Sequence, residues 1–138
     1  MKFKTNKKEY DLYIGLAFVK ELDMRYQQNF AGVEFGHGVA KVFLGLTQYN
    51  PIAFADYVLA ATITEDIPPT LKEIEETMLS WSPEDITKYY DDFLDALAEN
   101  SLTRAQVGQI AMTQMMIEAR AMQDKEDEKK LQRGRIEN

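Results

Sequence analysis

The sequence predicts a mainly α-helical protein, in which a small N-terminal β-hairpin is followed by about six helices and the last helix is extended. Three observations lead to this expectation. Apolar residues recur at helical spacing along most of the chain, helix-start signals precede several of these runs, and strand-like alternation is confined to residues 2–14. The 138 residues, 45% of them hydrophobic and 28% charged, are enough to bury a core as one domain.

The hairpin is predicted from a two-residue period on both sides of a polar turn. Phe3 and Thr5 alternate with lysines before the turn at residues 6–8, and the apolar positions of residues 10–14 then continue the alternation. The turn lacks the glycine that often follows asparagine in tight hairpins. The alternation alone therefore carries this prediction.

Two helices are expected next, joined by a glycine-rich link. Helical spacing begins at Leu16, and Gly32, Gly36 and Gly38 punctuate the segment that follows the first helix. The apolar stripe of the first helix consists of Gly15, Phe18, Val19, Leu22 and Tyr26, and that of the second of Phe35, Val39, Val42, Phe43 and Leu46.

Asn50 and Pro51 mark the start of a third helix that is expected to run to about residue 63. Asparagine caps the free amides of a first turn, and proline is tolerated at the first helical position because its missing N–H has no partner there. This segment is apolar on nearly every side, which is typical of a helix surrounded by other elements. It is the predicted central helix.

A fourth and a fifth helix follow two further start signals. Thr70 and Glu73 have the spacing of a capping box directly after Pro68 and Pro69. The segment Ser82-Pro83-Glu84-Asp85 repeats this pattern and places carboxylates in a first turn, where the helix dipole favours them. The apolar positions are Leu71, Ile74, Met78 and Trp81 in the fourth helix, and Ile86, Tyr90, Phe93, Leu94 and Leu97 in the fifth.

The last helix is expected to begin near Thr103 and to reach about residue 133, because no proline interrupts it. Ten apolar residues between Val107 and Met122 spread around more of its circumference than one core-facing stripe occupies. From Gln123 onward the composition changes to charged residues. We therefore expect one domain over residues 1–122 and a charged helical or disordered tail over residues 123–138.

Methionines give the candidate contact surface of this last helix. Four of the seven lie within residues 112–122, and their flexible, polarisable side chains suit surfaces that accept helical partners. Ordinary core packing remains the open alternative, because it is the commoner use of methionine. In the fifth helix Tyr89 points away from Tyr90 and is a further candidate. The predicted partner or subunit contacts are Tyr89, Met112, Met115, Met116 and Met122.

The charge distribution argues against nucleic acid as a partner. The net charge is −7, and residues 64–104 hold eleven acidic and three basic side chains, while residues 1–63 carry +1 and residues 105–138 are neutral overall. Such a surface repels phosphate backbones. No long apolar run follows the lysine-rich residues 1–8 or occurs elsewhere, so neither a secretory signal nor a membrane span is expected.

No residue set indicates catalysis, a cofactor or a metal ion. The chain has no cysteine, and its single histidine, His37, lies between two glycines without a recognisable nucleophile motif. Asp91 and Asp95 share one helical face and have oxygen ligands suited to magnesium or calcium. The same spacing is common on acidic solvent-facing surfaces, which is the interpretation we prefer.

Four segments occur in a distinctive order: residues 8–23 (KEYDLYIGLAFVKELD), 32–38 (GVEFGHG), 50–62 (NPIAFADYVLAAT) and 69–75 (PTLKEIE). In order and spacing they resemble the tail assembly chaperone family of phages with long non-contractile tails that infect Gram-positive hosts. The resemblance covers about residues 1–100. The methionine-rich part after residue 101 has no counterpart in it.

This resemblance implies a non-enzymatic protein that binds and solubilises the helical tape measure protein in the host cytoplasm and assists assembly of the tail tube. It also implies a homo-oligomer, a longer frameshifted form that recruits the tail tube protein, and absence from the mature virion. The alternative is a structural phage protein, such as a head-tail connector component, that is retained in the virion.

Overall fold

The computed structural model describes residues 1–30 and 33–137, so that Gly32 of the expected glycine-rich link lies outside the described residues. The mainly helical fold with an N-terminal hairpin and a long last helix is confirmed. The chain forms two compact units, Met1–Val107 and Gly108–Asn138. No helix among the described residues is both long and apolar enough to cross a membrane.

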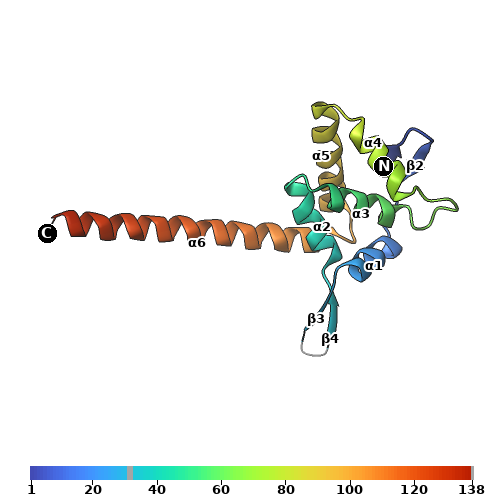
Figure 1. Cartoon of the computed structure of the whole chain (residues 1–138). Coiled ribbons are helices and arrows are strands. Elements are labelled where there is room, and N and C mark those ends of the chain that lie inside the picture. Colours follow the sequence, from blue (N-terminus) through green and yellow to red (C-terminus); the bar gives the residue numbers. More distant parts are fainter. Residues whose placement is uncertain (31–32, 138) are drawn as a thin grey trace. The chain divides into compact units, whose positions relative to one another are not determined.

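Six helices and two hairpins make up the described chain (Figure 1). The strands are β1 (Lys2–Lys4), β2 (Glu9–Asp11), β3 (Gln27–Phe30) and β4 (Val33–Gly36). The helices are α1 (Leu16–Arg25), α2 (Gly38–Thr47), α3 (Pro51–Ala61), α4 (Leu71–Leu79), α5 (Pro83–Glu99) and α6 (Arg104–Glu137).

The hairpins are both antiparallel, and only the first was predicted. In β1–β2, Phe3 lies opposite Tyr10. In β3–β4, Gln27 pairs with Gly36, so strands occupy most of the segment that the sequence analysis assigned to a link. Phe35, which was predicted to lie in the second helix, is in β4, and that helix begins only at Gly38.

Gly38 allows α2 to start directly against the end of α1. A Cβ atom at this position would lie 2.1 Å from the backbone carbon of Leu22, which no side chain can tolerate. The Gly38 N–H also donates a hydrogen bond of 3.1 Å to the Asp23 carboxylate. The glycine therefore sets how closely the two helices pack.

The predicted helix starts are confirmed in atomic detail. The Asn50 side chain accepts hydrogen bonds from the amides of the next helix at 2.8 and 3.3 Å, and Thr70 accepts one from the Glu73 amide at 3.1 Å. Ser82 and Asp85 form a reciprocal capping box with distances of 3.2 and 3.1 Å. Each cap satisfies amides that would otherwise lack a partner.

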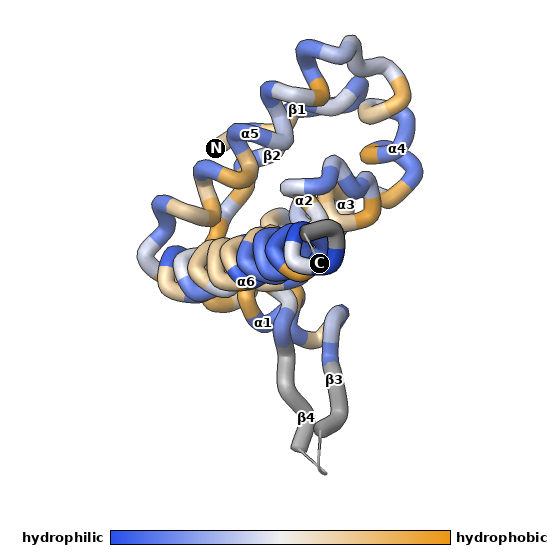
Figure 2. The backbone as a smooth tube through the Cα atoms, turned by 90° about the vertical axis from the view of Figure 1, so that its left-hand side faces the viewer, coloured by the Kyte–Doolittle hydropathy of each residue, from blue (hydrophilic) through white to orange (hydrophobic). Residues whose placement is uncertain are grey.

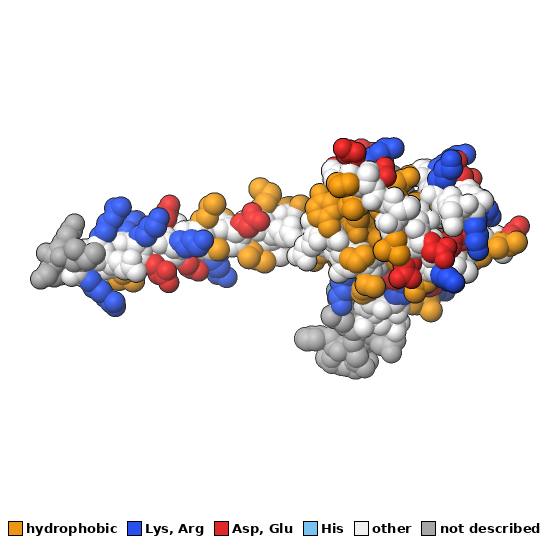
Figure 3. All heavy atoms as spheres, turned by 45° about the horizontal axis from the view of Figure 1, so that its top comes forward, with side chains coloured by type: hydrophobic (Ala, Val, Ile, Leu, Met, Phe, Trp, Pro, Cys, Tyr) orange, Lys and Arg blue, Asp and Glu red, His pale blue; other side chains and the backbone are white. Residues whose placement is uncertain are grey.

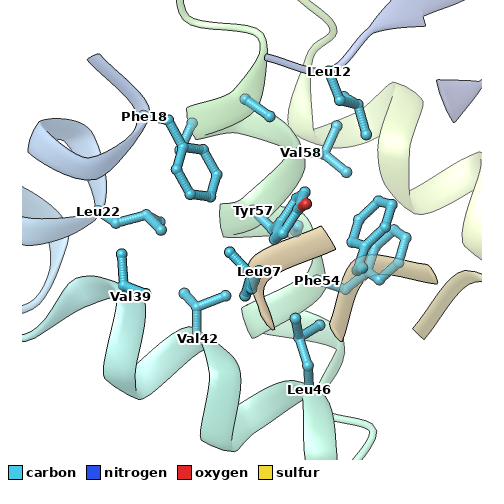
Figure 4. Packing of buried hydrophobic residues seen from close by; sticks show 14 of the residues in the cluster. Leu12, Phe18, Leu22, Val39, Val42, Leu46, Phe54, Tyr57, Val58 and Leu97 are labelled. Carbon is cyan, nitrogen blue, oxygen red and sulfur yellow. The ribbon is translucent and has the colours of Figure 1, made fainter. Parts of the chain in front are cut away.

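The core of the first unit is organised around α3, as its sequence predicts. This helix packs against α1, α2 and α4. The rings of Phe54 and Tyr57 each stack on Phe93 of α5, with centroid distances of 4.2 Å. Figure 4 shows these α3 side chains meeting aliphatic residues of α1 and α2, with the Tyr57 hydroxyl inside the cluster. Phe3 brings the N-terminal hairpin to the same aromatic group.

The second unit consists of α6 from Gly108 onward. The helix continues without a break through residue 122, where the composition changes from apolar to charged. The described part of the charged segment is helical as far as Glu137. The domain boundary expected at residue 122 itself stays a prediction.

Candidate protein-docking surfaces

An apolar groove lies between the first turns of α3 and the length of α4. Its volume is about 360 Å³. Along α4 in Figure 2, hydrophobic and hydrophilic residues are interspersed, as expected of an amphipathic helix. The lining residues are Pro51, Ile52 and Ala55 from α3, and Leu71, Ile74, Glu75, Met78 and Leu79 from α4.

Large apolar side chains at the groove remain open to solvent. Ile52 is 65% exposed, Leu71 is 60% exposed and Leu79 is 80% exposed, although Ile74 at the base of the groove is fully buried. Single exposed apolar side chains are common, but three large ones around one apolar hollow form a patch, and such patches mark interaction sites. The hollow is a candidate docking surface.

This groove was not predicted from the sequence. Leu71 was expected to share one apolar stripe with Ile74 and Met78, whereas in the structure Ile74 is buried in the core and Leu71 is exposed. Leu79 falls outside that stripe, and its position was the sequence signal that could have revealed the groove. An apolar residue away from the core-facing side of a short amphipathic helix indicates a second contact.

A buried carboxylate fixes α4, and thus one wall of the groove, to the N-terminal hairpin. Glu73 accepts hydrogen bonds from the Thr5 hydroxyl at 2.6 Å and from the Tyr10 hydroxyl at 2.9 and 3.0 Å. Burial alone would raise the pKa of Glu73, but these hydrogen bonds, the nearby charge of Lys7 and the Thr70 contact outweigh it and hold the pKa below its usual value. The ionised form is therefore part of the fold.

The same contact shifts the pKa of Tyr10 in the opposite direction, upward. Burial, together with the hydrogen bond and the charge of Glu73, raises the pKa of Tyr10 to about 12. The hydroxyl consequently keeps its proton and remains a donor to the carboxylate over the physiological pH range.

A second anchor joins the end of α1 to α3. Asp56 accepts hydrogen bonds from the Tyr26 hydroxyl and from Arg25 Nη1, the latter at 3.2 Å. Arg25 also pairs with Glu21 at 3.0 Å. These contacts position the chain where it leaves α1 for β3.

Tyr89 occupies an intermediate environment. Its ring stacks on Trp81 with a centroid distance of 4.7 Å, and it is half-buried, whereas Tyr90 is 3% exposed and belongs to the core. Tyr89 also lines a second, more polar hollow of about 410 Å³, together with residues of the β1–β2 turn such as Asn6. Its role as a contact residue stays a prediction.

The methionine-rich segment of α6 is the other candidate surface. The second unit has one described helix and no other described element, so nothing within that unit covers its apolar side chains. Figure 3 shows hydrophobic side chains along one part of this helix and charged ones toward its end. The exposed apolar residues of the segment are Met112 (60%), Met115 (68%), Met116 (70%), Ile117 (63%) and Met122 (70%).

The residues considered for acid-base or metal chemistry do not come together. His37 is exposed directly before α2, and Asp91 and Asp95 are exposed on α5. Among residues 1–30 and 33–137, no three histidine, aspartate or glutamate side chains are grouped closely enough to hold a metal ion.

The fold and its surfaces define a helical protein whose prominent exposed features are apolar contact areas. Residues 2–111 match the family described as "Phage tail assembly chaperone protein, TAC". The protein therefore belongs to the phage tail assembly chaperone family, as the resemblance of residues 1–100 predicted, and a chaperone role in tail assembly follows. No curated protein and no solved structure gives a significant match to the chain.

The family match ends at residue 111, so it divides the two candidate surfaces. The α3–α4 groove lies inside the matched region, whereas all four methionines of the α6 segment, Met112 to Met122, lie beyond it. The groove therefore belongs to the part of the chain that matches the family, and the methionine-rich surface lies outside the matched residues.

Proposed function

We propose that this protein binds the long, helical tape measure protein of its phage, keeps it soluble and assists assembly of the tail tube around it. A tape measure helix exposes apolar stripes that would otherwise aggregate, and covering them requires apolar surface on a soluble carrier. No catalytic step is needed for this role.

The observation that carries the proposal is the apolar part of α6, residues 108–122. Its large apolar side chains, Ile110, Met112, Met115, Met116, Ile117 and Met122, lie on most sides of a helix whose unit contains no core to bury them. Burial of each such side chain against a partner contributes roughly 1.5 to 3 kcal/mol. Methionine also adapts its shape to different apolar surfaces, which suits a long and irregular partner.

Self-association belongs to the same proposal. One helix with apolar residues around most of its circumference offers a second face after a partner occupies the first. Copies of the chain would share this second face and form a homo-oligomer along the tape measure protein. A longer, frameshifted form would then bring the tail tube protein to the complex.

Co-expression with the phage's tape measure protein tests the proposal. We expect the soluble fraction of the tape measure protein to rise several-fold when this chain is present, and multi-angle light scattering of the purified chain to give a mass above that of the 15.9 kDa monomer. Unchanged solubility of the tape measure protein would contradict the proposal.

The alternative role, that of a connector-type structural protein, differs in the final location of the protein. We place this chain in the host cytoplasm during assembly and outside the finished particle. Quantitative mass spectrometry of purified virions separates the two roles: a chaperone is missing, whereas a connector component is present in a fixed ratio to the other tail proteins.

A further inference from the structure

The α3–α4 groove is an apolar site on the first unit, and its residues are separate in sequence from the methionine-rich helix. Its walls are helices held in place from both sides: Asn50 caps α3, and Glu73 fastens α4 to the hairpin. Such anchoring means that the groove exists before any partner arrives, so binding there needs little reorganisation.

The shape and lining of the groove suit a helical occupant. Two neighbouring helices form its sides, and Ile52, Leu71 and Leu79 stand at its edges with more than half of each side chain exposed. An amphipathic helix inserts apolar residues into such a groove at positions i, i+3, i+4 and i+7, and its backbone polar groups are already paired within the helix.

Charge defines the occupant further. Of the eight lining residues, the single charged one is Glu75, and its carboxylate is exposed. A partner helix with lysine or arginine beside its apolar stripe complements this carboxylate, whereas one with acidic flanks is repelled.

The charge of the groove argues against α6 of a second copy as its occupant. Its apolar segment is followed by residues 124–130, which contain four acidic and three basic side chains, so it has no net basic flank. Docking the segment in the groove would bring this mixed run toward Glu75 without the basic excess that the carboxylate favours.

We propose that the α3–α4 groove binds an apolar helix of a partner protein whose flanking side chains are basic. The inference rests on the proposed function in one respect, since the natural occupant would then be a basic-flanked helical segment of the tape measure protein. It also assigns a second contact to the chain, within the region shared by the family.

A peptide-binding experiment with the full-length protein tests the groove directly. The probe is a synthetic amphipathic helix with a leucine stripe and lysines at its edges, and the matched probe carries glutamates at the same edge positions. We expect fluorescence anisotropy to show about tenfold tighter binding of the lysine peptide, equivalent to one strong charge-assisted contact. Equal binding of the two peptides would overturn the charge argument.

Matched variants separate the groove from general attraction to an acidic protein. Glu75→Lys and Leu79→Ala are expected to weaken binding of the lysine peptide about tenfold each. Asp92→Lys makes the same charge change at an exposed α5 position, and Leu16→Ala truncates a leucine that is 74% exposed on α1. These controls should change affinity less than twofold; losses equal to those of the groove variants would overturn the proposal.

A third peptide, residues 104–130 of this chain, addresses the second-copy alternative. It carries the apolar segment and the mixed acidic and basic run that follows, with a net charge of zero. We expect it not to displace the lysine peptide from the groove. Displacement at comparable concentration would overturn the assignment to a basic-flanked partner and would indicate that another copy of the chain occupies the groove.

Co-expression of the same variants with the tape measure protein keeps this inference separate from the proposed function. If the unmodified chain raises the solubility of the tape measure protein but Glu75→Lys and Leu79→Ala raise it equally, the groove proposal fails and the chaperone role stands. If the unmodified chain has no effect, the chaperone role fails, and the peptide experiment still decides what the groove binds.

Discussion

The core of the first unit and the apolar segment of α6 have similar residue types and opposite surroundings. In α3, residues such as Phe54 and Val58 are fully buried because α1, α2 and α4 pack against this helix. In residues 108–122 of α6, methionines and isoleucines of comparable size have no neighbouring element within their unit. A helix with apolar residues on most sides can therefore be either the centre of a core or a surface that binds partner proteins.

What separates the two cases is the sequence around them. The α3 segment is bounded by Asn50-Pro51 and Thr62, and the helices before and after it, α2 and α4, return the chain to the same core. The α6 segment is followed by charged residues that continue the helix instead of turning it back. Substitutions in the first region should therefore change stability, and those in the second should change association.

The largest expected effect is that of Phe54→Ala in the central helix. This ring is fully buried and stacks on Phe93 at 4.2 Å with an angle of 6° between the rings. We expect the free energy of unfolding to fall by about 3 to 5 kcal/mol, measured by urea denaturation. A loss below about 1 kcal/mol would show that α3 is not the centre of the core.

The Glu73 contact should give the next largest effect. Glu73→Gln removes the charge that receives hydrogen bonds from Thr5 and Tyr10, and we expect a loss of about 2 kcal/mol in the free energy of unfolding at pH 7. Glu75→Gln, two positions along the same helix and exposed, is the control and should change stability by less than about 0.5 kcal/mol.

The same carboxylate predicts a pH dependence. Because the pKa of Glu73 is lower in the folded state than its usual 4.5, its contribution is complete above that value and is lost as the pH falls through the lowered pKa. The difference in the free energy of unfolding between the natural chain and Glu73→Gln should therefore shrink as the pH falls from 7 through the lowered pKa. A constant difference across that range would contradict this assignment.

Tyr57→Phe should raise the free energy of unfolding, by a smaller amount than the substitutions of Phe54 and Glu73 lower it. The Tyr57 hydroxyl is buried without a hydrogen-bond partner among the described residues, and burial raises its pKa. Removing an unsatisfied hydroxyl while keeping the ring should raise the free energy of unfolding by about 1 kcal/mol, measured by thermal or urea denaturation. A loss of stability would mean that the hydroxyl has a partner, such as a buried water molecule.

The smallest expected effect on stability is that of Met115→Gln with Met116→Gln in α6. Glutamine has a helix propensity close to that of methionine, and both side chains are more than two-thirds exposed. The urea midpoint should therefore stay within the error of the measurement. A destabilisation of about 2 kcal/mol or more would place this segment in a core and remove the contrast with α3.

Local sequence signals predicted much of the first unit. Asn50, Thr70 and Ser82 begin helices as expected, because a cap and its amides are only two or three residues apart in the chain. The β3–β4 hairpin escaped prediction because Gln27-Gln28-Asn29 has no apolar alternation, so backbone pairing determines the strands there.

The contact surfaces were predicted only in part. The excess of apolar residues around α6 was visible in the sequence, since it needs no knowledge of distant packing. The α3–α4 groove depends on how Ile52 and Leu71, nineteen positions apart in the chain, are placed by the fold, and periodicity within one helix carries no such information. The Glu73 anchor was missed for the same reason, because its donors come from the hairpin.

Co-expression of the tape measure protein with a quadruple variant, in which Met112, Met115, Met116 and Met122 are all replaced by glutamine, tests the distinction between core and contact surface most directly. We expect the variant to fold with an unchanged urea midpoint while the soluble fraction of the tape measure protein returns to its level without any chaperone. If the variant solubilises the tape measure protein as well as the natural chain does, the methionine-rich surface is not where the partner is held.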